Sequence, residues 1–167
     1  SHSNPTLTSV EQLMDERPDS ALAILQGMDT LTLKSSEEKA LYALLSVQAQ
    51  EKNHIVVKDS ARIQAAVDFY ADSKDDYHKM LAYYYLARVE ENLHKYALGI
   101  VNLLKAEAVA KKIPDYFYLG MIYRSFSDIY NRVYNGVEGV KYAQKAYECF
   151  QKSGHTLHAD WGLLDIG

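Results

Sequence analysis

Residues 83–106 read YYYLARVEENLHKYALGIVNLLKA and predict the fold of the whole chain: a helix, a tight turn and a second helix that returns along the first. The same pattern recurs one repeat later, where Tyr83 falls on Tyr123 and Ala106 falls on Ala146. Two helices of this kind cannot bury their apolar faces alone. A repeat as long as the step from Tyr83 to Tyr123 therefore indicates helical hairpins that stack on one another.

The rest of the chain divides into further helix pairs. Helix caps, among them Ser35 or Ser36 and Asp115, and turn residues place these pairs at about 6–30, 36–73, 76–113 and 115–154, with a further, truncated helix at 155–167. Pro114 has no N–H to donate, so we expect it to end the third pair. The segment His54–Ser60 is rich in β-branched residues, and we interpret it as an extended linker and not as a strand. The prediction is a single all-α domain over 1–167, a right-handed α-α superhelix of helical hairpins.

Composition indicates a folded chain with no character of a nucleic-acid-binding or membrane-spanning protein. Hydrophobic residues make up 48% and charged residues 24%, and the formal net charge of -4 gives no basic field for phosphates. No apolar run reaches the roughly 18 residues that a membrane span requires. A single cysteine excludes an internal disulfide. The first five residues include Ser-His-Ser without a methionine and resemble the remnant of a cleaved tag, so we expect a piece of a longer protein.

Small and aromatic residues recur at fixed helical spacings in the two best-matched pairs. These positions are Tyr83, Leu86, Ala87, Gly99, Leu103 and Ala106, followed by Tyr123, Phe126, Ser127, Gly139, Ala143 and Ala146. In this pattern the chain resembles the tetratricopeptide repeat family, although its period, the step from Tyr83 to Tyr123, exceeds the usual length of about 34 residues in that family. The resemblance implies a scaffold that binds a protein or peptide segment in a concave groove, with no catalysis and no cofactor.

Two other stretches are similar to the repeat-bearing input halves of bacterial signalling and regulatory proteins. They are PDSALAILQGMD at 18–29 and KDSARIQAAVDFY at 58–70. This similarity implies an alternative function: a sensory or regulatory input domain that packs within its own chain or forms a homodimer through the C-terminal end around Trp161. Because many such proteins lie outside the cytoplasmic membrane, it also favours a periplasmic or other extracytoplasmic location.

The concave face is expected to follow the first helix of each pair. We count one place beyond the packed aromatic and then four and seven residues further, and include the adjacent polar residue. The candidate groove residues are Tyr84, Arg88, Glu91, Asn92, Arg124, Asp128, Asn131 and Arg132. Tyr and Arg are frequent interface anchors, and Arg can hold a carboxylate through two hydrogen bonds, so we expect a carboxylate-bearing partner. The alternative is a solvated face on which Arg88 pairs with Glu91 and Arg124 with Asp128.

Histidines offer the remaining candidates for chemistry. A metal site would need four ligands from His155, His158, Asp160 and Cys149, and we interpret these histidines as ordinary turn residues instead. Three further histidines are expected near helix C-termini, which favour a partly charged imidazole: His54, His78 and His94. The sequence contains no GxSxG, HExxH or CxxC motif, and we predict no catalytic site.

Overall fold

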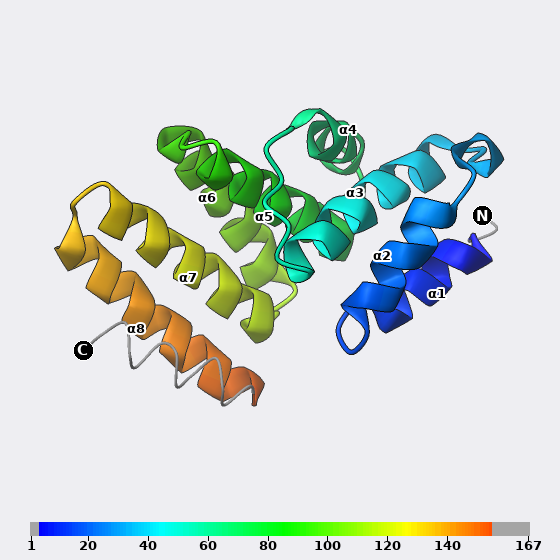
Figure 1. Cartoon of the computed structure of the whole chain (residues 1–167). Coiled ribbons are helices and arrows are strands. Elements are labelled where there is room, and N and C mark those ends of the chain that lie inside the picture. Colours follow the sequence, from blue (N-terminus) through cyan, green and yellow to red (C-terminus); the bar gives the residue numbers. More distant parts are fainter. Residues whose placement is uncertain (1–3, 155–167) are drawn as a thin grey trace.

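The computed structural model describes residues 4–154, and every regular element in that range is helical (Figure 1). The elements are α1 (Pro5–Leu13), α2 (Pro18–Gly27), a 3₁₀ turn (Thr30–Thr32), α3 (Ser36–Lys52), α4 (Ala61–Tyr70), α5 (Asp76–Asn92), α6 (Tyr96–Lys112), α7 (Tyr116–Arg132) and α8 (Gly136–Ser153). None of these helices combines the length and the apolar character needed to cross a lipid bilayer.

Consecutive helices pack as hairpins, and the hairpins stack in chain order. Within the hairpins, α1 packs on α2, α3 on α4, α5 on α6, and α7 on α8. Neighbouring hairpins meet through α2 and α3, α4 and α5, and α6 and α7, while α1, α3, α5 and α7 also touch in succession. The prediction of an all-α superhelical array of hairpins is confirmed.

The start of each long odd-numbered helix recurs at one fixed interval along the chain. Ser35, Asp75 and Asp115 are the N-caps of α3, α5 and α7. Each side chain accepts a hydrogen bond from the backbone N–H three residues further on, which satisfies one of the free donors at a helix start. The sequence predicted the first cap at Ser35 or Ser36 and the third at Asp115, and the structure supplies Asp75 between them.

The ends of the same three helices recur at the same interval. His54, His94 and Tyr134 follow α3, α5 and α7 with φ of 60°, 59° and 59°, the left-handed region in which residues other than glycine are rare. In each case the next residue's N–H bonds back to a carbonyl five positions earlier, so the last turn closes in the same way. Both ends of α3, α5 and α7 are therefore defined by hydrogen bonds as well as by packing.

The core consists of two clusters that meet at α3. Leu45 and Ala49 belong to a small N-terminal cluster with residues of α1 and α2, whereas Leu44 and Val47 belong to the large cluster that extends to α8. The small residue Ala106 of the repeat pattern lies in this core, with no exposed surface. The equivalent residues of α4 and α8, Ala66 and Ala146, are also fully buried.

The linker between α3 and α4 differs from the other turns within hairpins. Residues 55–60 form neither helix nor strand, which confirms the prediction of a linker. α6 and α8 have 17 and 18 residues, whereas α4 has 10. The repeat register aligns Val56 with Tyr96, the first residue of α6, but α4 begins only at Ala61. The first turn of this second helix is thus replaced by extended chain.

Candidate functional site

A pocket of about 320 Å³ opens between α3, α5 and α7, the three helices that lie in succession along one side of the array. Its lining combines charged, aromatic and small polar side chains: Glu51, Lys52, His54, Tyr84, Tyr85, Arg88, Met121, Arg124, Ser125 and Asp128. Four of the eight predicted groove residues are among them, namely Tyr84, Arg88, Arg124 and Asp128. We call this site the concave pocket.

Arg88 lies at the centre of an ion-pair network in this pocket. Its Nη1 is 2.6 Å from Glu91 Oε2, and its Nη2 is 3.9 Å from Glu51 Oε2 on α3. Burial disfavours the guanidinium charge, but Tyr84 and the three surrounding carboxylates, including Asp128, outweigh it and raise the pKa of Arg88 above its ordinary value. The Arg88–Glu91 pair allowed by the spacing is therefore present. Arg88 stays protonated, and the carboxylates around it balance its positive charge.

Glu91 occupies an internal position, which corrects its expected place on the groove wall. Its surface is only 6% exposed, and burial raises the pKa of its carboxyl group against the opposing effect of Arg88. Arg132 contributes from α7 with Nε 3.8 Å from Glu91 Oε1, and more than half of the Arg132 side chain remains exposed. Glu91 thus links α5 to α7 beneath the pocket.

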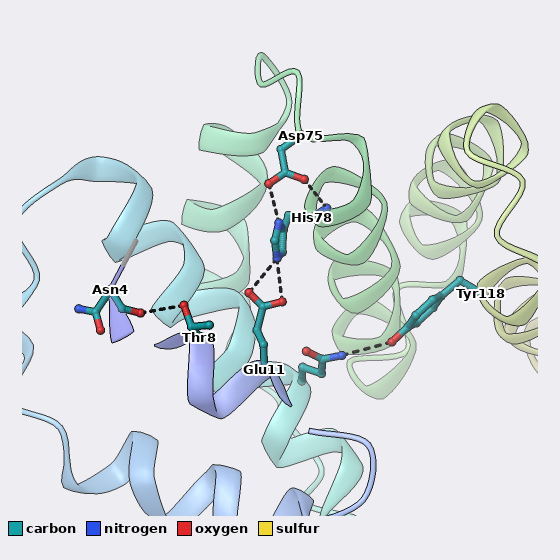
Figure 2. A network of polar contacts seen from close by, with 7 residues as sticks. Asn4, Thr8, Glu11, Asp75, His78 and Tyr118 are labelled. Atoms are coloured by element: carbon teal, nitrogen blue, oxygen red, sulfur yellow. Dashed lines mark hydrogen bonds and ion pairs between the residues drawn. The ribbon is translucent and has the colours of Figure 1, made fainter. Parts of the chain in front are cut away.

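Tyr84 forms the floor of the pocket and does not project from it as the expected aromatic anchor. Only 3% of its surface is exposed, because its ring packs edge-on against Tyr85 at 4.9 Å and Tyr118 at 6.0 Å between centroids. Burial raises the pKa of Tyr84. Tyr118 of α7 accepts a 3.2 Å hydrogen bond from Gln48 Nε2 on α3 (Figure 2). The tyrosine cluster therefore joins α3, α5 and α7.

The two predicted asparagines have structural contacts outside the pocket. Asn92 donates to Glu51 Oε1 at 2.8 Å and to the carbonyl of Val57 at 3.0 Å, so it holds the linker against α5. Asn131 points at Gly139 of α8, where its Oδ1 occupies the space that a Cβ at Gly139 would need. Asn92 therefore positions the linker, and Asn131 contacts the last hairpin while its surface remains exposed.

Several lining residues were missed because the groove rule was applied only to α5 and α7. One repeat before Arg88, Glu91 and Asn92, the equivalent positions on α3 are Gln48, Glu51 and Lys52. Of these, Glu51 and Lys52 line the concave pocket, and Gln48 bonds to the tyrosine cluster. The signal was available in the repeat, but Ala43 stands on α3 where α5 and α7 have Tyr83 and Tyr123, so the rule that starts from a packed aromatic residue did not find it.

A second polar network holds α1 against α5 (Figure 2). His78 Nδ1 is 2.5 Å from Asp75 Oδ2, and His78 Nε2 is 3.1 Å from both carboxylate oxygens of Glu11. The His78 ring also stacks on Tyr70 of α4 at 5.5 Å between centroids. Burial opposes protonation, but the hydrogen bonds to Glu11 and Asp75 prevail and raise the pKa of His78.

This network corrects the expectation that His78 lies near a helix C-terminus. His78 is in the first turn of α5, where the positive end of the helix dipole disfavours imidazolium, and the two carboxylates compensate. His54 and His94 do follow the ends of α3 and α5. The carboxylate partner from α1, 67 positions earlier in the chain, could not be read from local sequence.

Within residues 4–154, no cluster of three or more histidine, cysteine, aspartate or glutamate side chains is arranged to hold a metal ion. His155, His158 and Asp160 of the metal hypothesis, Trp161 of the dimer hypothesis and the truncated helix at 155–167 lie outside the described residues. Comparison of the chain with protein-family models, curated proteins and solved structures finds no match.

Proposed function

We propose that this chain is a protein-binding helical repeat module that holds a peptide segment of a partner in its concave pocket and performs no catalysis. The observation that carries the proposal is the pocket itself: about 320 Å³ of space on the successive faces of α3, α5 and α7, floored by buried tyrosines and rimmed by charged side chains. Sites of this kind, with an aromatic base and a few polar groups, suit an extended chain or a short helix.

The charge of the lining favours a partner with a carboxylate. Three basic side chains, Lys52, Arg88 and Arg124, face two acidic ones, Glu51 and Asp128. Arg88 pairs with Glu51 and Glu91, and Lys52 pairs with Asp15 at 3.1 Å, so the proposal assigns the contact with the partner to the positive excess of the lining as a whole. The excess is small, and it supports orientation of the partner more than affinity.

The repeat supports the same function. Caps at Ser35, Asp75 and Asp115 recur at one period, and so do fully buried alanines at Ala66, Ala106 and Ala146. This regularity agrees with the resemblance to the tetratricopeptide repeat family. That resemblance implies a scaffold that binds a protein or peptide. We therefore infer that binding uses the face the repeats share.

Charge reversal at the pocket tests the proposal. Arg124→Glu changes the pocket lining, and Lys141→Glu is a matched reversal on α8, where the Lys141 side chain is 63% exposed and pairs with Glu138. Each variant is used in a crosslinking pull-down from source-cell fractions after its melting temperature is compared with that of the parent. We expect a partner that Arg124→Glu loses and Lys141→Glu retains. Equal capture by all three proteins would contradict binding in the pocket.

A second candidate function, a sensory or regulatory input domain that self-associates, is favoured by one surface. Leu98, Val101 and Leu104 recur every three residues on α6 and are 52%, 47% and 49% exposed. Apolar stripes of this kind mark contact surfaces. Sedimentation over a range of concentrations, with Leu104→Lys as the variant, separates the two functions: a dimer that this variant dissociates favours the input domain, whereas a monomer at all concentrations contradicts it.

A further inference from the structure

The shortened helix α4 leaves a second groove beside the linker, and this groove shares no lining residue with the concave pocket. Two cavities of about 300 and 260 Å³ adjoin at Gln50 and Arg62, between α2, α3, α4 and residues 55–59. In the third hairpin, helix α6 begins at the position equivalent to Val56, so helical backbone occupies the equivalent place. We call the two adjoining cavities the linker groove.

One edge of the linker backbone is fixed and the other is open. Asn92 Nδ2 donates to the carbonyl of Val57 at 3.0 Å. In extended chain the backbone groups of successive residues point to opposite edges, so those of Val56 and Lys58 face away from Asn92. Within the described residues, no hydrogen bond uses the N–H of Val56 or of Lys58. The open edge can therefore pair with another extended chain.

The side chains around this edge combine apolar surface with positive charge. Ile55 and Val56 are 42% and 62% exposed although both side chains are apolar. Lys58 and Arg62 line the first cavity with one carboxylate, Asp59, which already accepts the backbone N–H of Ala61 at 3.0 Å. An occupant with an apolar side chain and a carboxylate would complement both features.

A buried hydroxyl supplies an independent sign of an absent occupant. Ser46 lines the second cavity, is 3% exposed, and its Oγ has no hydrogen-bond partner in the described structure. A buried polar atom without a partner is costly, and nearly all such atoms in proteins are satisfied. No other side-chain N or O atom in the described residues is left in this state.

We propose that the linker groove binds an extended, carboxylate-bearing segment of a partner protein. The segment adds a strand to the open edge at Val56 and Lys58, places an apolar side chain in the cavity and directs its carboxylate to Lys58 and Arg62. A polar group of the segment satisfies Ser46. This site lies apart from the concave pocket, so it is independent of the function proposed above.

The probe is a phage-displayed library of random peptides of about eight residues, a common strand length. The expected result is enrichment of peptides in which a β-branched residue and an acidic residue stand two positions apart, because such residues lie on the same face of a strand. The affinity of a selected peptide should fall about tenfold or more with Arg62→Glu, as expected for loss of a charge-assisted contact. Arg124→Glu, in the concave pocket, should leave that affinity within about twofold, because additivity holds for distant sites.

Backbone pairing is tested by Val56→Pro, which removes the N–H of residue 56, against Val56→Thr, which keeps the N–H and the branched shape. The proline variant should lose binding and the threonine variant should retain it. If Val56→Pro lowers the melting temperature, slowed amide exchange at residues 56 and 58 of the parent on adding peptide replaces it as the readout.

Three outcomes overturn the proposal. The first is a library that yields no enriched peptide. The second is enriched peptides that bind Arg62→Glu as well as they bind the parent, or that leave exchange at residues 56 and 58 unchanged. The third is a dimer of the chain that Arg62→Glu dissociates, which would assign the linker groove to a second copy.

Discussion

His78 lies between carboxylates from two helices, so its charge state affects how firmly α1 is held. Glu11 faces it from α1 and Asp75 from the start of α5, with Tyr70 of α4 and the neighbouring Tyr77 packed against the ring. The pKa of His78 is raised in the folded state. Its stabilising contribution is therefore fully present below the unfolded pKa of about 6.5 and is lost as the pH rises through the higher folded value.

His78→Gln should remove this pH dependence. At about pH 6, where the unfolded imidazole is partly charged, the variant should be about 1–3 kcal/mol less stable than the parent, as for charge-assisted hydrogen bonds. The difference should shrink as the pH rises. Urea unfolding at a series of pH values measures it, with the exposed His94→Gln as control. Parallel stability curves for parent and His78→Gln would show that the contacts with Glu11 and Asp75 do not depend on charge.

Tyr134 is a residue at which the backbone is strained without a compensating contact of its side chain. Its φ is 59° and its side chain is 97% exposed. Because glycine adopts this conformation without a Cβ clash, Tyr134→Gly should stabilise the protein by about 0.5–1 kcal/mol. Tyr134→Ala is the control, since it removes the ring and keeps the Cβ. Chemical denaturation compares the three proteins, and equal midpoints for the glycine and alanine variants would exclude relief of backbone strain.

At the scale of helices, one close contact in the last hairpin depends on a position without a side chain. A Cβ at Gly120 of α7 would collide with the ring of Phe150 on α8, and this ring is fully buried. Gly120→Ala should therefore cost about 1–3 kcal/mol, although alanine is the better helix former. Thermal and urea unfolding measure this loss.

Gly136 provides the matched control on the same hairpin. A Cβ there meets nothing within 4 Å, so Gly136→Ala should be neutral or slightly stabilising. If both alanine variants unfold at the same denaturant concentration, the close packing of α7 on α8 at Gly120 is not the cause of any change.

The contact between α5 and α6 depends on a small residue. Ala106 is fully buried in the large cluster. Ala106→Leu adds three carbons where there is no free space, and we expect a loss of about 1–3 kcal/mol through overpacking. Ala108→Leu, on the same helix at an exposed position, is the comparison. A melting temperature equal to that of the parent for Ala106→Leu would contradict the close approach of the two helices.

For the molecule as a whole, two clusters predict two levels of stability. The N-terminal cluster is small and is joined to the rest through α3 and the bridge between Glu11 and His78. Regions with fewer buried contacts open at lower free energy. Amide hydrogen exchange should therefore be faster in α1 and α2 than in α5 and α7. Uniform protection along the chain would show that the whole array unfolds as one unit.

Much of the fold could be predicted from sequence because its signals are local. Ser35, Pro114 and Asp115 act within one turn of the chain, and the repeat register needs no knowledge of tertiary contacts. Asn4 was missed as the N-cap of α1 because the first five residues were interpreted as the remnant of a tag, although Leu7 and Val10 follow at helical spacing. The bounds of α4 were only partly predictable, since β-branched residues 55–57 favour extended chain and do not say where the helix resumes.

The site was less predictable because a helical face does not report how deep a side chain lies. The rule based on spacing brought Arg88, Arg124 and Asp128 into one pocket. The same rule did not show that two of its residues are buried. Tyr84 packs against Tyr85 and Tyr118, and Glu91 pairs with Arg88 and Arg132. These corrections depend on contacts between α5 and α7, which periodicity within one helix cannot supply.

Because the caps are equally spaced, a whole hairpin can be removed or inserted without changing how the next helix begins. A cut before Asp75 and another before Asp115 would remove one hairpin and join Lys74 directly to a residue that caps a helix in the same way. The left-handed turn positions His94 and Tyr134 are separated by the same number of residues as the caps Asp75 and Asp115. Recombination at these points would lengthen or shorten the array by whole hairpins, and the length of the face formed by the odd-numbered helices would change in the same increments.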